Sequence, residues 1–431
     1  MQESKPLTLR RNFSWTFIGN AVYAACQWGM LVVLAKLGSS EMVGQFTLGL
    51  AVTAPVIMLT NLQLRAIQAT DAKKQYLFSD YLGLRLLSTT LALIAIATIT
   101  LISGYQWETS LVILLVGLAK AFESISDVYY GLIQQHERMD RMAMSLMIKG
   151  PLSLLLLGMG IYISHHLVGG VLGLILAWAA VLVGYDIRSS IFILNNGTSE
   201  RGALHPRWNL KTLSRLVWLA LPMGLVMMLI SLNDSIPRYI IARYLGEQQL
   251  GIFAAMAYLM VAGNMVVLAL GQSASPRLAK YYATGDRKAF STLLVKLAGI
   301  GAVLGGVAVL VALIGGRELL TLLYKPEFAQ QADLFVWLMV AAGIGYVASF
   351  LGYGMTAARY FRIQIPLFAS ATGMSAVTCL WLIPTRGLQA AAIALVLSAI
   401  VQIVFSLAVI VHALYKIPER KEVVSILELR N

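Results

Sequence analysis

Long apolar segments separated by short polar turns make up most of this 431-residue chain. Each segment is about 20 to 30 residues long, enough for an α-helix to cross the roughly 30 Å hydrocarbon core of a membrane. No alternation of apolar and polar positions indicates a strand. The pattern predicts an all-α integral membrane protein of about twelve transmembrane helices, at 12–35, 42–69, 79–103, 107–134, 142–164, 167–194, 213–244, 248–272, 288–314, 328–357, 360–383 and 387–414.

A polar segment, Asn195 to Asn209, interrupts this series at its midpoint. We therefore expect two six-helix lobes, at 1–194 and 213–414, joined by a cytoplasmic linker at 195–212. A cytoplasmic tail is expected at 415–431.

The two halves share short matching segments in the same order, which indicates an internal repeat. The matches pair Leu37–Phe46 with Leu245–Phe253, Thr70–Lys74 with Thr284–Lys288, and Tyr130-Gly131 with Tyr353-Gly354. Because each half holds an even number of spans, the repeats would have the same orientation in the membrane. Parallel repeats of this kind are typical of transporters, whose substrate site lies between the halves.

Composition and charge agree with this interpretation. The chain is 58% hydrophobic and 12% charged, with a mean hydropathy of +0.76. Most of its 33 Lys and Arg lie in the N-terminus, the tail and the connections on one side, so the positive-inside rule places both termini in the cytoplasm. The net charge of +13 then reflects contact with anionic membrane lipids, and no nucleic-acid partner is needed to explain it.

Several basic residues fall inside the predicted spans, where each would cost roughly 2.5–3.5 kcal/mol at a helix centre. They must extend to the membrane surface, pair with acids, or line a wet cavity. For Arg85 and Lys149, near a cytoplasmic helix end, we expect extension to the surface. The six residues are Arg65, Arg85, Lys120, Lys149, Arg238 and Lys296.

The fourth predicted helix carries a polar stripe of Lys120, Glu123, Asp127, Tyr130 and Gln134 on one face. Lys120 and Glu123 could neutralise each other, since they are three residues apart. Asp127 would still need a partner. We favour a water-filled cavity beside this stripe.

The second predicted helix places Asn61, Arg65 and Gln68 on a common face, either as a polar cavity wall or as groups near the membrane surface. In the seventh, Pro237 separates Asp234 from Arg238. A proline removes a backbone hydrogen bond, and broken helices of this kind line transport pathways, although a simple packing kink has the same signature.

No catalytic residue, metal site or cofactor site is expected. His165 and His166 have no suitably spaced carboxylate or cysteine, and Cys26 and Cys379 lie in separate apolar runs. The sequence contains no Gly-rich phosphate loop after a strand and no nucleophile paired with a base. These observations argue against an enzyme.

Three stretches resemble those of a known family: Asn12 to Asn20, the Leu-Gly…Val-Gly-Gln-Phe turn at 37–46, and Gly131 to Asp140. They are similar to bacterial polysaccharide flippases, the Wzx-type O-antigen and capsule transporters of the multidrug/oligosaccharidyl-lipid/polysaccharide (MOP) superfamily. The resemblance implies a MATE-like fold in the bacterial inner membrane, with two six-helix lobes that open alternately to each side. It also implies a polyprenyl-diphosphate-linked oligosaccharide as substrate, and polysaccharide assembly proteins as possible partners.

A diphosphate headgroup would need cations, and the arginine fork is well shaped for phosphate. We therefore expect substrate contacts from Arg65, Lys120, Arg238, Arg277, Asn61 and Gln68. The acids would balance these charges or bind a coupling H⁺ or Na⁺, and they are Glu123, Asp127 and Asp234.

Two alternatives stay open. A cation-coupled multidrug or metabolite antiporter on the same scaffold would need an acidic cavity, whereas basic residues predominate here. A membrane-embedded polysaccharide polymerase or ligase would need a large external loop, and the predicted external connections are short. Lipid II flippases of the same superfamily carry an arginine deep in the first helix, and the multidrug branch often carries an acidic residue there. This chain has neither, and the polar residues deep in its first helix are Asn20 and Gln27.

Overall fold

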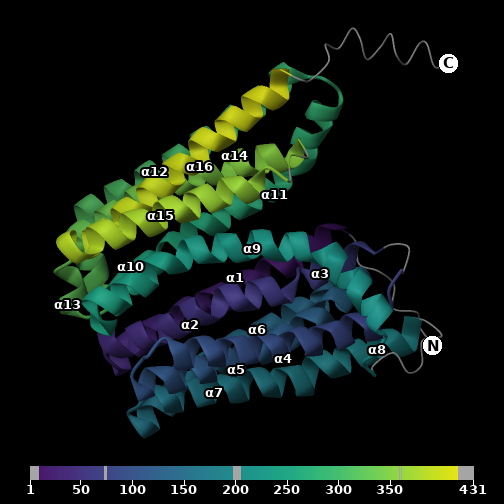
Figure 1. Cartoon of the computed structure of the whole chain (residues 1–431), viewed down its shortest axis with the longest axis horizontal. Coiled ribbons are helices and arrows are strands. Elements are labelled where there is room, and N and C mark those ends of the chain that lie inside the picture. Colours follow the sequence, from purple (N-terminus) through teal and green to yellow (C-terminus); the bar gives the residue numbers. More distant parts are fainter. Residues whose placement is uncertain (1–8, 72–74, 198–204, 359, 361, 416–431) are drawn as a thin grey trace. The chain divides into compact units, whose positions relative to one another are not determined.

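The computed structural model describes residues 9–71, 75–197, 205–358, 360 and 362–415, which form helices joined by turns and no strand (Figure 1). The all-α prediction is therefore confirmed. The tail predicted at 415–431 lies outside the described residues beyond Tyr415, as does the 198–204 portion of the predicted linker.

The first half of the chain contains a helical series that ends before the polar segment. Its elements are α1 (Leu9–Leu37), α2 (Ser40–Asn61), α3 (Leu64–Thr70), α4 (Phe78–Ile102), α5 (Trp107–Gln135), α6 (Met139–Ser164), α7 (Leu167–Val181), the π-helix η1 (Leu182–Asp186) and α8 (Ile187–Gly197). The second half begins with α9 (Leu210–Leu245) and continues with α10 (Glu247–Tyr258), α11 (Met260–Ala283), α12 (Arg287–Leu323), α13 (Pro326–Ala329), α14 (Ala332–Ala357), α15 (Gln364–Arg386) and α16 (Leu388–Tyr415).

Within the described residues, eleven helical segments are long and apolar enough to cross a membrane. The 29-residue helix α5 is not among them. It nevertheless exceeds the roughly 20 residues that a span requires, and it is the helix that carries Lys120, Glu123 and Asp127. Together these helices account for the twelve predicted spans, which confirms a multi-pass membrane protein.

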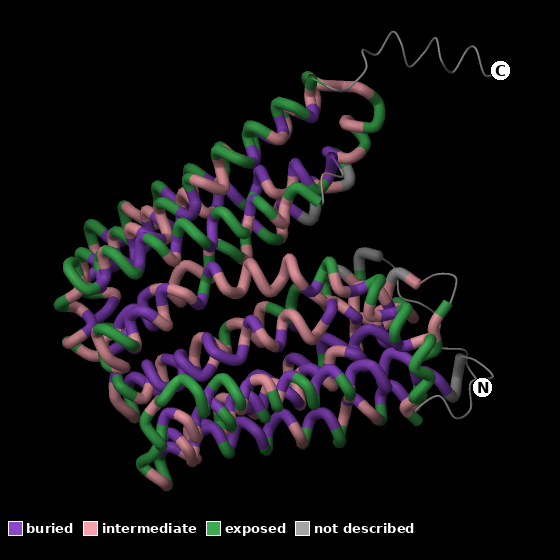
Figure 2. The backbone as a smooth tube through the Cα atoms, viewed as in Figure 1, coloured by how far each residue is buried: buried purple, intermediate pink, exposed green. Residues whose placement is uncertain are grey.

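Large apolar side chains are exposed along helices of both halves, among them Leu101, Ile102, Tyr162, Ile314 and Trp381. In Figure 2, buried and exposed positions alternate along the helices. Apolar exposure on this scale is unusual for a soluble monomer and is expected where lipid covers the outer surface.

The helices form two compact units, residues 1–235 and 236–431, so the boundary falls inside α9. The predicted boundary lay earlier, in the polar segment at 195–212. The N-terminal part of α9 belongs with the first unit because Leu213, Leu216 and Ala220 join a core formed with Leu62 and Leu82, among others.

The two units share part of their pattern of helix neighbours. In the first unit, α5 packs against α4 and α7, and α6 packs against α7. In the second, α14 packs against α12 and α16, and α15 packs against α16. Helix α5 also contacts α2, α3, α6, η1 and α8, so it is the central helix of the first unit.

Two of the three matches in the sequence include residues at corresponding turns. Ser39 caps α2, accepting a hydrogen bond from the backbone of Met42, and Gly246 stands at the corresponding start of α10. The Asp71 carboxylate accepts backbone hydrogen bonds just before α4, and Asp286 does the same at the start of α12. Such caps satisfy backbone N–H groups that a helix start leaves unpaired.

Two of the stretches that resemble polysaccharide flippases are joined by Asn12. Its side-chain Nδ2 donates to the carbonyl of Glu137 at 2.9 Å, and its Oδ1 accepts from the N–H of Met139 at 3.2 Å. Glu137 has a φ of 54°, a left-handed conformation uncommon outside glycine. Asn12 thus holds the α5–α6 turn against α1.

The second predicted helix is not continuous. It ends at Asn61, and Leu62 and Gln63 both adopt left-handed conformations, with φ of 52° and 51°, before α3 begins. Helix α12, by contrast, continues beyond its predicted end at 314, with a non-helical φ of −124° at Gly315.

Candidate functional site

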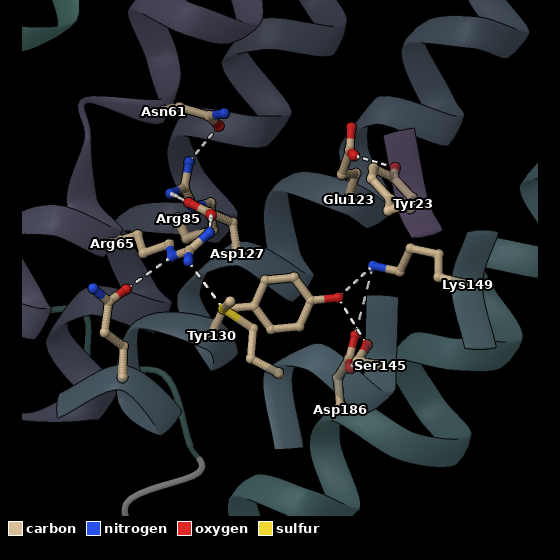
Figure 3. A network of polar contacts seen from close by, with 12 residues as sticks. Tyr23, Asn61, Arg65, Arg85, Glu123, Asp127, Tyr130, Ser145, Lys149 and Asp186 are labelled. Carbon is tan, nitrogen blue, oxygen red and sulfur yellow. Dashed lines mark hydrogen bonds and ion pairs between the residues drawn. The ribbon is translucent and has the colours of Figure 1, made fainter. Parts of the chain in front are cut away.

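The polar stripe of α5 lies inside the first unit, where its side chains meet residues from neighbouring helices (Figure 3). Asp127 lies between Arg65 of α3 and Arg85 of α4. Its Oδ2 accepts a hydrogen bond from Arg85 Nη2 at 3.2 Å, and its Oδ1 lies 3.6 Å from Arg65 Nη1. We call these three residues, with Asn61 and Gln134, the arginine cluster. It holds two guanidinium groups and one carboxylate, and therefore one positive charge in excess.

The two arginines differ in exposure. The Arg85 side chain is 0% exposed and the Arg65 side chain is 33% exposed, while Asp127 is 27% exposed. Arg85 Nη1 donates to Asn61 Oδ1 from the end of α2. Arg85 thus anchors the carboxylate, and the excess charge is accessible at Arg65.

The other contacts of Arg65 are with neutral groups. Its Nε donates to Gln134 Oε1 at 3.1 Å, its Nη2 lies 2.9 Å from Met142 Sδ, and its guanidinium lies 5.8 Å from the centre of the Tyr130 ring. A thioether is a weak acceptor, and a charged oxygen makes a much stronger hydrogen bond to a guanidinium. Arg65 is therefore suited to bind an anion.

A second group, which we call the buried cluster, comprises Tyr130, Ser145, Lys149 and Asp186. Lys149 Nζ donates to Tyr130 Oη at 2.9 Å and lies 3.8 Å from Asp186 Oδ2. Ser145 donates to Asp186 and lies 2.8 Å from Tyr130 Oη. Because Tyr130 also faces Arg65, its ring lies between the two clusters (Figure 3).

The prediction that Arg85 and Lys149 extend to the membrane surface is wrong. Both are fully buried, at 0% and 1% exposure, and each faces a carboxylate from another helix. The reason is that these positions point into the helix bundle. There, pairing offsets much of the cost of removing the charge from water.

Lys120 and Glu123 form the expected pair within α5, with Lys120 Nζ 2.7 Å from Glu123 Oε2. Glu123 also accepts a hydrogen bond from Tyr23 of α1 at 2.7 Å, and the Lys120 ammonium lies 5.1 Å from the Trp178 ring centre. The neutralising interpretation is therefore confirmed for this pair, whose side chains are 24% and 30% exposed.

Local backbone features place the key side chains. Asp186 is the last residue of the π-helix η1, and a π-turn changes the direction in which subsequent side chains point relative to a regular α-helix. The left-handed Leu62 and Gln63 separate Asn61 from Arg65, so these two residues belong to different helices. Both irregularities lie next to the polar clusters, where such strain is commonly found.

Gln68 has a different environment from the one expected. It is 1% exposed, and with its amide turned to satisfy its neighbours it would bond the backbone of Val128 and Leu132 in α5. Gly131 permits this contact, because a Cβ there would overlap the Gln68 side chain and lie 3.3 Å from Arg65 Cα. Gln68 thus packs α3 against α5, and nothing in its surroundings suggests a ligand contact.

The remaining candidates lie outside these clusters. Arg238 is half-buried on α9, and its buried Nε has no hydrogen-bond partner in the described part of the chain. Asp234 is exposed on the same helix, which continues through Pro237, and Arg277 is exposed on α11. Their roles in substrate binding or charge balance stay predictions.

Asp186 and Tyr23 are the principal residues that the sequence reasoning did not find. Asp186 had a usable signal, since it is an acid within the apolar run at 167–194, where an ionisable residue indicates a partner or a function. Tyr23 had none, because tyrosine is common in membrane helices. Among the described residues, no group of three or more His, Cys, Asp and Glu is placed to hold a metal ion.

Comparison with known proteins identifies the scaffold. Among solved structures, the chain is similar to an inward-facing multidrug resistance transporter of the MATE family. The TM-score is 0.66 at 14% sequence identity, and the match covers 94% of this chain and 99% of that one. A variant of the MATE transporter VcmN of Vibrio cholerae gives 0.63 at 14% identity over 94% and 96% of the two chains. A MOP superfamily transporter of Pyrococcus furiosus gives 0.58 at 17% identity over 93% and 95%. The fold is therefore MATE-like, as the resemblance implied.

Sequence comparison identifies the family. The capsular polysaccharide biosynthesis protein CapF of Staphylococcus aureus is 27% identical over 396 residues, covering 91% of this chain and 97% of CapF. The family described as polysaccharide biosynthesis protein matches residues 9–282, well over half of the chain. The chain therefore belongs to the polysaccharide biosynthesis protein family, on the fold of the MOP superfamily transporters.

Proposed function

We propose that the protein is a flippase, which moves a polyprenyl-diphosphate-linked oligosaccharide from the cytoplasmic to the outer leaflet of the bacterial inner membrane by alternating access. The observation that supports this most is the excess positive charge of the arginine cluster, accessible at Arg65 near the end of a segment that is long and apolar enough to cross the membrane. An ionisable residue within such a segment is costly in lipid and indicates a partner or a function.

A diphosphate is the headgroup that fits this site best. Arg65 presents a planar fork whose Nη2 now faces only a thioether, so two phosphate oxygens could replace that contact. The polyprenyl chain could stay in the bilayer while the headgroup crosses. Lys120 is partly exposed and offers a second cation, although Glu123 already neutralises it.

Arg238 and Arg277 of the second unit stay predicted substrate contacts, and Asp234, at the end of the first unit, stays a predicted charge-balancing residue. The central helix of the second unit, α14, has Asp333 in its first turn and no charged residue in the rest of its length. The first unit, through α5, would therefore make the principal electrostatic contact.

An antiporter for organic cations, coupled to H⁺ or Na⁺, is the second candidate. The MATE-like fold and the partial exposure of Glu123 and Asp127 favour it. Each of these acids already faces a basic partner, however, and Asp127 faces two. The arrangement suits an anionic substrate better, and the family and fold point to transport rather than to an enzyme such as a polymerase or ligase.

The test is a flipping assay in liposomes that contain the purified full-length protein and a fluorescent polyprenyl-diphosphate oligosaccharide. An added quencher reports the fraction of label exposed on the outside. We expect Arg65→Gln to slow protein-dependent movement about tenfold or more, the effect of losing a charge-assisted hydrogen bond. Arg138→Gln is the matched control, since Arg138 is a partly buried arginine paired with Asp140 outside the clusters.

Movement that requires the protein, slows in Arg65→Gln and persists in Arg138→Gln would support the proposal. Absence of movement, together with export of an organic cation from the same vesicles, would contradict it and favour the antiporter.

A further inference from the structure

Asp127 pairs with two arginines, and the two interactions differ in strength. Its two oxygens face different guanidinium groups, Oδ2 toward Arg85 at 3.2 Å and Oδ1 toward Arg65 at 3.6 Å. A charge-assisted hydrogen bond to a carboxylate is typically about 2.7–2.9 Å long. The contact with Arg65 is therefore an ion pair without a hydrogen bond, and it is the weaker of the two.

Arg85 depends on Asp127 for its neutralisation. It is completely buried, and Asp127 is the only carboxylate with which it pairs among the described residues. Within the described part of the chain, its guanidinium makes one further hydrogen bond, to the neutral Asn61 amide oxygen, and its buried Nε has no hydrogen-bond partner. Separating Asp127 from Arg85 would leave a bare charge in the protein interior, at a large cost.

Arg65 does not depend on Asp127 in this way. A third of its side chain is exposed, and Gln134 and Met142 hold its Nε and Nη2. If an anion took the place of Asp127, Arg65 would keep a counter-charge and Asp127 would keep Arg85. The exchange would leave every charge of the arginine cluster paired.

We propose that Asp127 is a displaceable internal counter-ion for the headgroup-binding arginine. In the empty site, the Asp127 carboxylate forms an ion pair with Arg65, at the position that a phosphate oxygen would take. An incoming diphosphate takes over Arg65, and Asp127 relaxes fully onto Arg85, which acts as a positioning residue. When the headgroup leaves, Asp127 returns toward Arg65. This inference rests on the proposed function, because it assumes that Arg65 contacts the headgroup.

Such a device suits a transporter, which must release its substrate as well as bind it. An arginine with no internal counter-ion would hold a diphosphate tightly and release it slowly. An arginine fully neutralised by its own carboxylate would bind it poorly. Sharing one carboxylate between two arginines gives an intermediate affinity.

The experiment measures binding of undecaprenyl diphosphate, without sugars, to the purified full-length protein in nanodiscs at fixed pH and salt. We expect Asp127→Asn to bind about three- to fivefold more tightly, as for removal of a partly exposed competing ion pair, and to dissociate more slowly. Asp140→Asn is the matched control, because Asp140 is also a partly exposed aspartate paired with an arginine. Its affinity should equal that of the wild type.

Asp127→Asn leaves Arg85 buried without its counter-ion and could unfold. The double variant Arg85→Gln/Asp127→Asn removes both charges and should show the same gain in affinity. The comparison uses whichever of these variants folds, and it requires that the wild type binds the lipid through Arg65. An affinity that is unchanged or weaker than that of the wild type would then overturn the counter-ion role of Asp127. If the wild type does not bind the lipid, or binds it equally after Arg65→Gln, the proposed headgroup site itself is wrong.

Discussion

At the scale of single residues, burial gives two chemically identical arginines different roles. Arg85 and Arg65 share one carboxylate, yet only Arg65 is exposed enough to meet a substrate. The same contrast separates Lys149 of α6, which the buried cluster encloses, from Lys120 of α5, which is partly exposed. A basic residue in a membrane helix can therefore serve structure or binding, and its surroundings decide which.

The buried cluster should contribute mainly to stability. Removing either charge of the Lys149–Asp186 pair leaves the other buried alone, so Lys149→Ala and Asp186→Ala should each cost about 3–5 kcal/mol of folding free energy. The double variant Lys149→Met/Asp186→Leu should recover much of this loss. Thermal unfolding of the purified protein measures it, with Arg138→Ala as a control that should cost less, because both side chains of the Arg138–Asp140 pair keep contact with solvent. Single variants as stable as the wild type would show that the pair is not needed.

The sequence located the polar stripe of α5 but could not supply all its partners. The pairing of Lys120 with Glu123 followed from their spacing on one helix. The pairings of Arg85 with Asp127 and of Lys149 with Asp186 did not, because the partners come from different helices. Distance from a helix end could not show whether either side chain points outward or into the bundle.

At the scale of helices, close approach of α3 to α5 positions Arg65. Gly131 lies at this contact, since a Cβ there would overlap Gln68 and crowd Arg65 Cα. The break at Leu62 and Gln63 creates the separate helix α3, and the apolar pattern gave no sign of it. A glycine in the sequence often indicates a left-handed backbone conformation, whereas a leucine or a glutamine does not.

Gly131→Ala should therefore displace α3 and Arg65 together. We expect it to reduce flipping in liposomes severalfold, with a larger effect on flipping than on thermal stability, because Arg65 would move away from Asp127 and Gln134. Gly373→Ala is the control, since a Cβ at that helical position meets no atom within 4 Å. Equal flipping by the two variants would contradict this role for the α3–α5 contact.

At the scale of the whole molecule, the repeat in the sequence corresponds to a repeat in structure but not in chemistry. The two units share part of their pattern of helix neighbours, and Asp71 and Asp286 accept backbone hydrogen bonds at corresponding turns. The multi-pass helical architecture, the MATE-like fold and the family could all be predicted from the apolar pattern and the resemblance. The point at which α9 passes from one unit to the other was not, because it depends on the packing of Leu213 and Leu216 rather than on polarity.

Membrane potential should influence a flippase that carries a diphosphate. About two negative charges leaving a negative interior gain roughly 4–5 kcal/mol at ~100 mV, at about 2.3 kcal/mol per charge per 100 mV. An inside-negative potential set by a potassium gradient and valinomycin should accelerate outward movement, and the reversed gradient should slow it. Rates that do not change with potential would show that the headgroup charge crosses fully neutralised or does not cross at all.

The most direct test of headgroup recognition compares two lipids that share one oligosaccharide and one polyprenyl chain, linked through either a diphosphate or a neutral group. In the same liposomes, the wild type should move the diphosphate lipid at least about tenfold faster, and Arg65→Gln should remove most of that difference. Equal rates for both lipids in the wild type would contradict recognition of the diphosphate by the arginine cluster.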